Sequence, residues 1–387
     1  MRVRPDREAL AATLATLIGL RSTYPPGDSR EIARFLAHRL KAAGYRVETL
    51  GRQPGVDNVV ARLGKGRPQL VISTHVDTVG VSTPETWASD PLAARVADDK
   101  IFGLGSANAK GSIAAQLWLA EQVAAAGGPQ RGELIFAFVG DEERLGPDGL
   151  AFLRESGVVT PEILIVGGPT ANQLVIAERG VMWARVTARG RTAHAGDPSA
   201  GDSAILRMIR VIGAIERTLG PRLAARCDGA MQATLNIGRI EGGHNTNAVP
   251  ERCAIEIDRR LLPSETVDGA FEELRAATTQ AGEPDGSVVL ERLTGTEGFK
   301  AGEDGAGVRA FRAAIEAETG RPAQFLNAMG VGDGRYFACD GIEIINFGPG
   351  DGAAGHAANE WVAIDQLVEA AAILMRVTAT LLQVEGR

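Results

Sequence analysis

The sequence predicts an α/β protein in which a domain built around a mixed sheet is interrupted by a smaller α+β domain. Strand-like and helix-like segments alternate through residues 1–179 and again through residues 297–387, which is typical of a sheet covered by helices. Between these two parts the order changes to β-α-β-β-α-β, the order of a ferredoxin-like unit. We therefore expect a discontinuous α/β domain formed by the two outer parts and an inserted domain formed by residues 180–296.

The outer parts show the periodicities that define these elements. Residues 29–44 repeat apolar positions at helical spacing and stop at Gly44, which suits a helix C-cap. The run QLVIST is nearly all apolar, as expected of a strand covered on both faces. The expected strands lie at 45–50, 58–63, 69–74, 133–140, 163–168 and 342–350, and the expected helices at 29–44, 111–126, 148–156, 304–319 and 364–383.

The insert and the start of the chain complete the expected set of elements. The first twenty residues contain Asp6 and Glu8 and no continuous apolar core, so we expect an amphipathic helix there rather than a targeting peptide. No apolar run in the sequence is long enough to span a bilayer. In the insert, the expected strands lie at 181–190, 233–243, 252–261 and 287–293, and the expected helices at 201–219 and 266–281.

The composition indicates a soluble cytoplasmic protein that acts on small molecules. The 387 residues include 48 Asp and Glu against 41 Lys and Arg, which gives a formal charge of -7. This mild acidity, spread along the chain, argues against nucleic acid or an anionic membrane as a partner. The three cysteines, Cys227, Cys253 and Cys339, are too few and too scattered for a disulfide framework or a metal site, which suits a reducing compartment.

Ionisable side chains follow three of the expected strands at the point where each strand ends. His75 and Asp77 follow QLVIST, Glu142 and Glu143 follow ELIFAFVG, and His356 follows IINFGPG. Because ligands bind beyond the carboxyl ends of strands in open α/β sheets, we expect these groups to meet at one edge. His75 and Asp77 point the same way from an extended segment, so Asp77 could orient the imidazole. Each group alone could be a plain loop residue, but three at one edge favour a metal site in which one glutamate binds the metal and the other reaches the reacting water.

A series of motifs gives a more specific indication. In chain order they are STHVDTVG, GLGSANAKGS, FVGDEERLG, IVGGPT, GRTAHAGDPSAGDSAI, GGHNTNAVPERC, DRRLLP, GVGDGR and FGPGDGAAGHAANE. With these motifs the chain resembles, over nearly its whole length, the M20 family of metallopeptidases and deacylases, which includes acetylornithine deacetylase, succinyl-diaminopimelate desuccinylase, aminoacylase and a glutamate carboxypeptidase. The resemblance implies a zinc-binding α/β catalytic domain carrying a smaller lid domain that usually dimerises. We therefore expect a homodimer formed through the insert.

The resemblance also implies a role for each ionisable group at the sheet edge. His75 would be a metal ligand, braced by Asp77. Glu142 would be the general base that deprotonates a water bound to the metal. Glu143 would be a ligand of one metal, and His356 would complete the shell of that metal.

In the insert, the resemblance implies three residues that act on the substrate. His194 matches the histidine that reaches the active site of a neighbouring subunit and polarises the scissile carbonyl. Asn247 and Arg260 match positions that hold the backbone and the carboxylate of the substrate, and a planar guanidinium suits a carboxylate because it donates two parallel hydrogen bonds. The alternatives are a plain surface loop for His194 and a surface ion pair with Asp258 or Glu256 for Arg260.

Two positions depart from the family pattern. The metal-bridging aspartate of the family falls at Asn108, and a third carboxylate ligand falls at Gly168 of GGPT. Only Glu143 then remains as an anionic ligand, beside His75, His356 and the neutral amide oxygen of Asn108. Two divalent ions so poorly compensated would repel by several kcal/mol even at an effective dielectric constant of about 20. We therefore expect one divalent metal, held by His75, His356 and Glu143 or by Glu143, His356 and Asn108.

Three interpretations of function remain open. The first is an M20-like hydrolase that cleaves an amide or related C–N bond of a small N-acyl amino acid or another carboxylate-bearing substrate, with one ion of zinc, manganese or cobalt. The second is a repurposed enzyme that works with little or no metal, with Glu142 and His194 as acid and base. The third is a ligand-binding homologue without catalysis. The retained Glu142, Asp77, His194 and Arg260 favour an enzyme, since buried acids need compensation.

Overall fold

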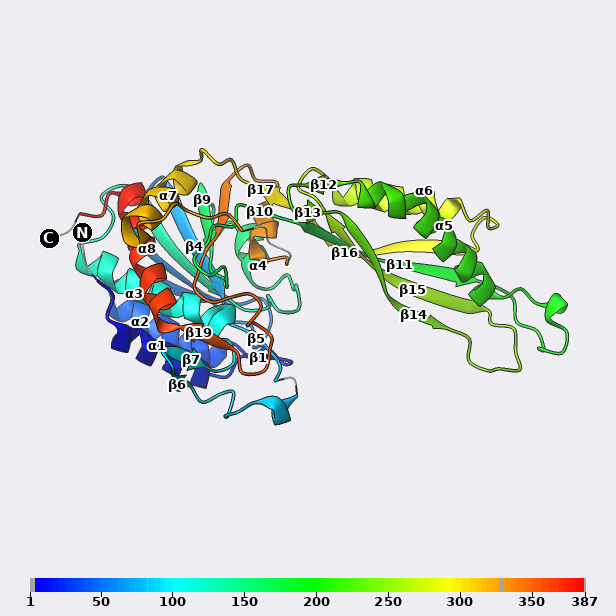
Figure 1. The fold of residues 1–387 in the computed structure, drawn as a ribbon, viewed down its shortest axis with the longest axis horizontal. Helices are drawn as coiled ribbons and strands as arrows, with labels where there is room; N and C mark the ends of the chain where they lie inside the picture. The colour runs from blue at the N-terminus through cyan, green and yellow to red at the C-terminus, as the bar shows by residue number, and fades with distance from the viewer. Residues whose placement is uncertain (1–3, 82, 327–329, 386–387) are drawn as a thin grey trace. The chain divides into compact units, whose positions relative to one another are not determined.

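The computed structural model describes residues 4–81, 83–326 and 330–385 (Figure 1). These residues divide into two compact units. Unit 1 contains the residues up to Ile176, Ala301–Leu326 and the residues from Gly332 onward, and unit 2 contains Ala177–Lys300 with Gly330 and Val331. Each unit has its own hydrophobic core, as a domain requires.

A six-stranded mixed sheet forms the centre of unit 1. Its strands, in spatial order, are β18 (Glu343–Asn346), β9 (Ile163–Val166), β4 (Gln69–His75), β8 (Glu133–Val139), β3 (Asn58–Gly64) and β2 (Arg46–Leu50). The first four strands are parallel to one another, and β3 and β2 pair antiparallel with their neighbours. β8 is buried at every residue, as its unbroken apolar run predicts. The mixed sheet predicted from the sequence is therefore confirmed.

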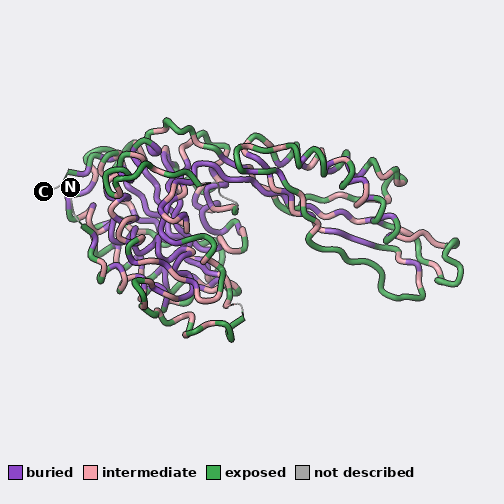
Figure 2. Tube along the Cα trace, viewed as in Figure 1, coloured by how far each residue is buried: buried purple, intermediate pink, exposed green. Residues whose placement is uncertain are grey.

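Helices cover this sheet and bury it. They are α1 (Arg7–Gly19), α2 (Arg30–Ala42), α3 (Gly111–Ala125), α4 (Leu150–Glu155), α7 (Ala306–Thr319) and α8 (Ile364–Leu382). α3 packs against α1, α8 and strand β4, and α8 also packs against α7. Because α3 lies between other elements, most of its residues are buried, and Figure 2 shows this buried core running through the strands and helices of unit 1.

Short strands join the loops around the sheet. β1 (Thr23–Tyr24) pairs in parallel with β5 (Thr78–Val79), which follows β4 along the chain. β19 (Trp361–Ala363), β7 (Lys100–Phe102) and β6 (Arg95–Ala97) form a separate three-stranded sheet. Strands of two or three residues are too short to carry a hydrophobic period, which is why the sequence does not predict them.

Unit 2 is an antiparallel sheet packed against two of its helices, α5 and α6. In chain order its main elements are β11 (Gly180–Arg189), α5 (Ala204–Ala224), β14 (Thr234–Gly242), β15 (Arg252–Leu261), α6 (Val267–Thr279) and β16 (Val288–Thr296). The four strands lie in the order β14-β15-β11-β16. Two short antiparallel pairings add β10 (Ala177–Glu178) with β17 (Phe299–Lys300) and β12 (Cys227–Asp228) with β13 (Met231–Gln232). The β-α-β-β-α-β order matches the order predicted from the sequence.

Helix α5 ends later than the sequence predicts. It continues to Ala224 through Pro221, whereas the expected helix stops at residue 219. The apolar face continues across this point, because Leu219 and Leu223 are both buried in the core of unit 2. Packing of that face therefore outweighs the helix-breaking tendency of proline. Although α5 has 21 residues, neither it nor any other described helix is long and apolar enough to cross a bilayer.

Candidate metal centre

The carboxyl ends of the parallel strands bring the candidate residues of unit 1 together. His75 is the last residue of β4, and Glu142 and Glu143 lie in the loop that follows β8. Because β4 and β8 are parallel neighbours, the residues that follow them start side by side. Asn108 lies in the irregular turn that leads into α3, and His356 lies in the loop after β18. These five side chains come from four separate segments of the sequence and meet at one edge of the sheet.

His75 is a buried imidazole that Asp77 holds from one side. Its Nδ1 lies 2.9 Å from the backbone oxygen of Asp77 and 3.7 Å from Oδ1 of the same residue. A main-chain carbonyl therefore orients the ring, and the carboxylate is an ionic neighbour beyond hydrogen-bond distance. The other carboxylate oxygen of Asp77 accepts a hydrogen bond from the Glu143 amide at 3.0 Å. Asp77 thus fixes both the end of β4 and the loop after β8, as a residue behind metal ligands does.

His75, Glu142 and Glu143 form a group that could hold a metal ion. One ligand atom from each of these residues lies within 4.8 Å of the other two. Imidazole nitrogen and carboxylate oxygen are both zinc ligands, and the carboxylate of Glu143 offsets part of the charge of one divalent ion. The residues present therefore fit a single ion.

The amide of Asn108 connects both histidines with Glu143. Its nitrogen Nδ2 donates to Glu143 Oε1 at 3.1 Å and lies 2.9 Å from His356 Nε2. Its oxygen Oδ1 lies 3.3 Å from His75 Nε2. A carboxylate can only accept a hydrogen bond, so the amide nitrogen must be the atom that faces Glu143. Asn108 thus links His75 and Glu143 by hydrogen bonds, at the position where the resemblance implies a metal-binding aspartate.

The side chains around Asn108 provide few ligand atoms for a second ion. An amide nitrogen has no lone pair for a cation, and this nitrogen is the atom directed at Glu143 and His356. At Gly168, where the family carries an acid, a Cβ would meet nothing within 4 Å. Space for an acidic side chain therefore exists at residue 168, but the acid is absent.

Glu360 is a buried acid of this edge that the sequence patterns did not single out. Its carboxylate accepts hydrogen bonds from the backbone amides of Gly105, Ala107 and Asn108 at 2.7, 2.8 and 2.8 Å. It thereby fixes the turn that carries Asn108, whose own backbone departs from helical geometry. A signal was present, since Glu360 ends the motif GAAGHAANE that contains His356.

The charges at this edge perturb one another. Burial opposes the charged form of His75, but the carboxylates of Glu142 and Asp77 outweigh it and hold its pKa well above the usual value. Burial raises the pKa of Glu142 to about 8, against the opposing effect of His75. The hydrogen bond to Glu143 raises the pKa of His356. A carboxyl group whose pKa lies near neutrality is suited to accept and return a proton.

The candidate residues of unit 2 lie towards opposite ends of its sheet. His194 and Asn247 are exposed on neighbouring loops, joined by a hydrogen bond of 3.0 Å from the Ala195 amide to the Asn247 backbone oxygen. Arg260 lies near the end of β15, whose first residue, Arg252, follows the Asn247 loop. An extended strand from Arg252 to Arg260 spans about 26 Å. One small molecule therefore cannot contact both Asn247 and Arg260 of the same unit.

Arg260 pairs with a neighbour on its own strand. Its guanidinium donates to the carboxylate of Asp258 at 2.7 and 3.1 Å, which is the ion pair expected as the alternative to substrate binding. Both side chains are about a quarter exposed, at 28% and 25%, so the pair is partly solvated. A second guanidinium is near, because Arg260 assists burial in lowering the pKa of Arg179.

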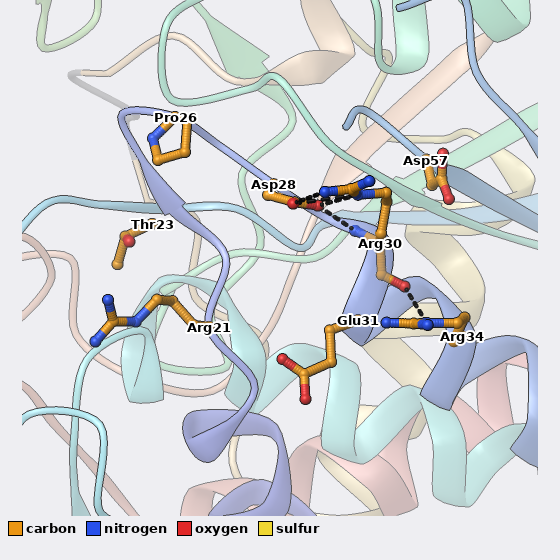
Figure 3. Close-up of a pocket in the computed structure, with 8 residues that line it drawn as sticks. All are labelled: Arg21, Thr23, Pro26, Asp28, Arg30, Glu31, Arg34 and Asp57. Atoms are coloured by element: carbon orange, nitrogen blue, oxygen red, sulfur yellow. Dashed lines mark hydrogen bonds and ion pairs between the residues drawn. The ribbon is translucent and has the colours of Figure 1, made fainter. Parts of the chain in front are cut away.

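A cavity elsewhere in unit 1 is lined by other residues. It has a volume of about 430 Å³ and is lined by Arg21, Thr23, Pro26, Asp28, Arg30, Glu31, Arg34 and Asp57 (Figure 3). The Arg30 guanidinium donates hydrogen bonds of 2.9, 3.1 and 2.5 Å to the Asp28 carboxylate, and these bonds lower the pKa of Asp28 to about 2. We place the candidate site at the strand ends instead, because the imidazoles and the carboxyl groups of raised pKa gather there.

Comparison with known proteins identifies the family of this chain. The profile of peptidase family M20/M25/M40 matches residues 71–380. The chain belongs to this family. It is 29% identical over 369 residues to a succinyl-diaminopimelate desuccinylase of Bordetella petrii, covering 93% of this chain and 94% of that protein. It is 28% identical over 372 residues to an N-acetyl-L-citrulline deacetylase of Xanthomonas campestris, covering 93% and 95%.

Solved structures of M20 proteins share this fold. A tripeptidase from Staphylococcus aureus aligns with a TM-score of 0.79 at 23% identity, covering 98% of this chain and 100% of that one. A dinuclear metal-binding peptidase of the M20 family from Bacillus subtilis aligns with a TM-score of 0.71 at 15% identity, covering 98% and 99%. The M20 resemblance inferred from the motifs is confirmed, and this M20 protein is a metal-dependent hydrolase of the peptidase and deacylase type.

Proposed function

We propose that this M20 protein hydrolyses an amide or related C–N bond of a small N-acyl amino acid or another carboxylate-bearing substrate, with one divalent ion. The proposal rests on the meeting of His75, Glu142 and Glu143, of which one nitrogen or oxygen atom each lies within 4.8 Å of the other two. His75 and Glu143 could then hold an ion beside Glu142. Two curated relatives, named for removing a succinyl and an acetyl group, support the substrate class. The free state of all three cysteines supports a reducing compartment such as the cytoplasm.

The ion would be held by His75, His356 and Glu143, or by Glu143, His356 and Asn108. Zinc suits these nitrogen and oxygen donors, and manganese or cobalt are the alternatives. When bound, the ion would polarise the carbonyl group of the substrate as a Lewis acid. At an effective dielectric constant of 20, two unit charges 4 Å apart repel by about 4 kcal/mol, and two divalent ions by roughly four times as much. With Asn108 and Gly168 in place of acids, too little negative charge remains to offset that repulsion.

Glu142 is the proposed general base. Its carboxylate would accept a proton from the attacking water and return it to the leaving nitrogen. In the absence of an ion, burial raises the pKa of Glu142 to about 8, and a divalent cation beside it would lower that pKa. Asp77 supports this chemistry without touching the substrate. Through its backbone oxygen and its carboxylate it holds His75 and the loop of Glu142 in register.

Unit 2 is the proposed lid and dimerisation domain. Because Asn247 and His194 lie far along the sheet from Arg260, the two sets would serve different sites of a homodimer. The exposed face of α5 supports this arrangement, since Leu206 and Ile209 are each 57% exposed, and β14 is an edge strand of its sheet. Replacing both Leu206 and Ile209 with glutamate should convert a dimer to a monomer in light scattering, and a wild-type protein that is monomeric would contradict the dimer.

The test of the proposed function is turnover of a panel of N-acetyl and N-succinyl amino acids and dipeptides by protein purified without chelator. The metal content of the same sample should be close to one equivalent. Glu142→Gln should lower kcat by about 10²–10⁴-fold and leave the metal content unchanged, because it removes the proton acceptor but no proposed ligand. If this variant kept the wild-type rate, Glu142 would not be the general base.

A second candidate is an M20-like enzyme that works with little or no metal. The hydrogen bonds at this edge favour it, because Asn108 bonds with His75 and Glu143, and His356 donates to Glu143 at 3.0 Å, all without an ion. Glu142 and His194 would then act as acid and base. Turnover by metal-free protein that chelator does not change would support this candidate, and ligand binding without turnover of any panel compound would contradict both.

A further inference from the structure

The motif GVGDGR places two buried charges beside the proposed base. Asp333 and Arg335 belong to a short 3-10 helix, η4 (Asp333–Phe337), in unit 1. They are only 4% and 3% exposed. Burying a charged group is costly unless its charge and its hydrogen-bonding groups find partners, so a pair of this kind needs a physical reason.

Arg335 is tied to the loop that carries Glu142. Its Nη2 donates to the Tyr336 hydroxyl at 2.6 Å, and this hydroxyl donates to the backbone oxygen of Gly146 at 2.7 Å. Gly146 lies in the loop after β8, in which the Leu145 amide donates to the backbone oxygen of Glu142 at 2.7 Å. Two hydrogen bonds thus lead from Arg335 to the Gly146 backbone, and the preceding residue, Leu145, is hydrogen-bonded to the backbone of Glu142.

The other terminal nitrogen of Arg335 has no hydrogen bond of its own. Nη1 lies 3.6 Å from Asp333 Oδ1, which is an ionic contact too long for a hydrogen bond. It is buried and finds no hydrogen-bond partner among residues 4–81, 83–326 and 330–385. Burial opposes the charge of Arg335, but Asp333 and the other acidic groups around it hold its pKa above the usual value. Asp333 and the Tyr336 hydroxyl therefore hold the guanidinium, and the hydroxyl is the group that reaches the loop of Glu142.

We propose that Arg335, held by Asp333 and Tyr336, is a positioning residue for Glu142. Through the Tyr336 hydroxyl, Arg335 fixes the loop on which Glu142 sits. This inference rests on the proposed function, since it takes Glu142 as the base. Arg335 acts through Glu142 rather than on the substrate, because its side chain is almost completely buried.

The first test needs no substrate. Hydrogen–deuterium exchange is compared between the full-length wild type, Tyr336→Phe and Arg335→Met, after circular dichroism has shown that each variant is folded. Tyr336→Phe removes one hydroxyl and with it both hydrogen bonds of the link. Amides of the loop 140–149 should therefore exchange about 3–10-fold faster, while those of α3 keep their wild-type rates. Unchanged exchange in the loop would overturn the proposal, whatever the protein turns over.

The second test is a double-mutant cycle on turnover of a panel substrate. Arg335→Met should lower kcat by about 10–100-fold, with KM within about threefold of the wild type and the metal content unchanged. In a Glu142→Gln background the same substitution should cost less than about threefold, because no base remains to be positioned. Arg335→Lys keeps the charge but lacks the planar fork, so it should restore part of kcat. Equal losses in both backgrounds would show a merely structural role and overturn the proposal.

The control variant is Arg154→Met. Arg154 pairs with Asp340, just past η4, and its side chain is 38% exposed. Its loss should leave kcat and the exchange of the loop 140–149 unchanged. If the wild type turned over no panel compound, the proposed function would fail, and the exchange measurement would still decide the role of the Arg335 link.

Discussion

At the scale of single residues, two absent charges distinguish this M20 protein from a site built for two ions. An aspartate at position 108 would repel the carboxylate of Glu143 unless a cation lay between them. The amide of Asn108 instead donates to Glu143 at 3.1 Å, so the two side chains attract each other without any ion. The amide at position 108 therefore stabilises the metal-free arrangement, and under the proposed one-ion site it should weaken the binding of a second ion.

The double variant Asn108→Asp/Gly168→Glu should raise the metal content from close to one towards two ions per chain. The reason is that it adds two carboxylates, and the new side chain at residue 168 has open space around its Cβ. Elemental analysis of dialysed protein measures the effect, with each single variant as a control. A metal content that stayed at the wild-type value in the double variant would show that charge does not limit the number of ions.

Lys110 should make stability rise with pH. Its ammonium group is buried, donates to the backbone oxygen of Leu20 at 2.8 Å, and has its pKa lowered by burial to about 7. Between pH 7 and about 10 the unfolded chain keeps a proton that the folded chain has released, so the free energy of unfolding gains up to about 1.4 kcal/mol per pH unit from this group. Urea unfolding of the wild type and of Lys110→Met measures it. Identical pH slopes for the two proteins would contradict a lowered pKa.

At the scale of elements, the position of the site depends on how closely the strand ends pack against α3. β9 ends at Val166, and a Cβ at Gly167 would meet Thr74 Oγ1 at 2.0 Å and Gln116 Nε2 at 2.5 Å. At Gly168 a Cβ would meet nothing. Close packing thus requires glycine at residue 167, whereas residue 168 has space for a side chain.

Gly167→Ala and Gly168→Ala form a matched pair for this packing. Gly167→Ala should destabilise the protein by about 1–3 kcal/mol because the methyl group overpacks the contact between β9 and α3. Gly168→Ala should change the free energy of unfolding by less than about 1 kcal/mol. Urea unfolding measures the free energy of unfolding of both variants. Similar losses of stability in the two would show that the close packing at Gly167 does not determine the effect.

The strand β8 could be predicted from its unbroken apolar run, and the helix α8 from apolar residues that recur at helical spacing. Both patterns arise because the buried positions of these elements require apolar side chains. The meeting of His75 with Glu142 and Glu143 could also be predicted, since adjacent parallel strands end at the same edge. The hydrogen bonds of Asn108 could not be predicted, because Asn108 lies in an irregular turn whose backbone is fixed by Glu360, a residue far away in the sequence. Arg335 was missed for the same reason: it follows no strand, and only the folded structure shows its burial.

At the scale of the whole molecule, the candidate metal ligands all belong to unit 1. The two parts of unit 1 that flank the main segment of unit 2 meet directly, since the Ala301 amide donates to the Ile176 backbone oxygen at 2.7 Å. The chain thus leaves unit 1 and returns to it at adjacent residues. Unit 1 could therefore close on itself without the segment between them.

Replacing residues 177–300 with a short glycine-rich linker should give a folded protein that still binds about one ion but turns over no substrate, because the proposed ligands remain while Arg260, Asn247 and His194 are lost. Circular dichroism and elemental analysis measure folding and metal content. A folded variant without metal would show that unit 2 contributes to the metal site, against the placement proposed for the ligands.

The number of ions bound at this edge decides between a one-ion site and the two-ion site of a dinuclear relative. The direct measurement is anomalous scattering at the zinc absorption edge from crystals grown with excess zinc. We expect one strong peak beside Glu143 and His75 or His356, and no second peak within about 4 Å of it. Two peaks of full occupancy at that spacing, bound by these same side chains, would contradict the charge limit set by Asn108 and Gly168.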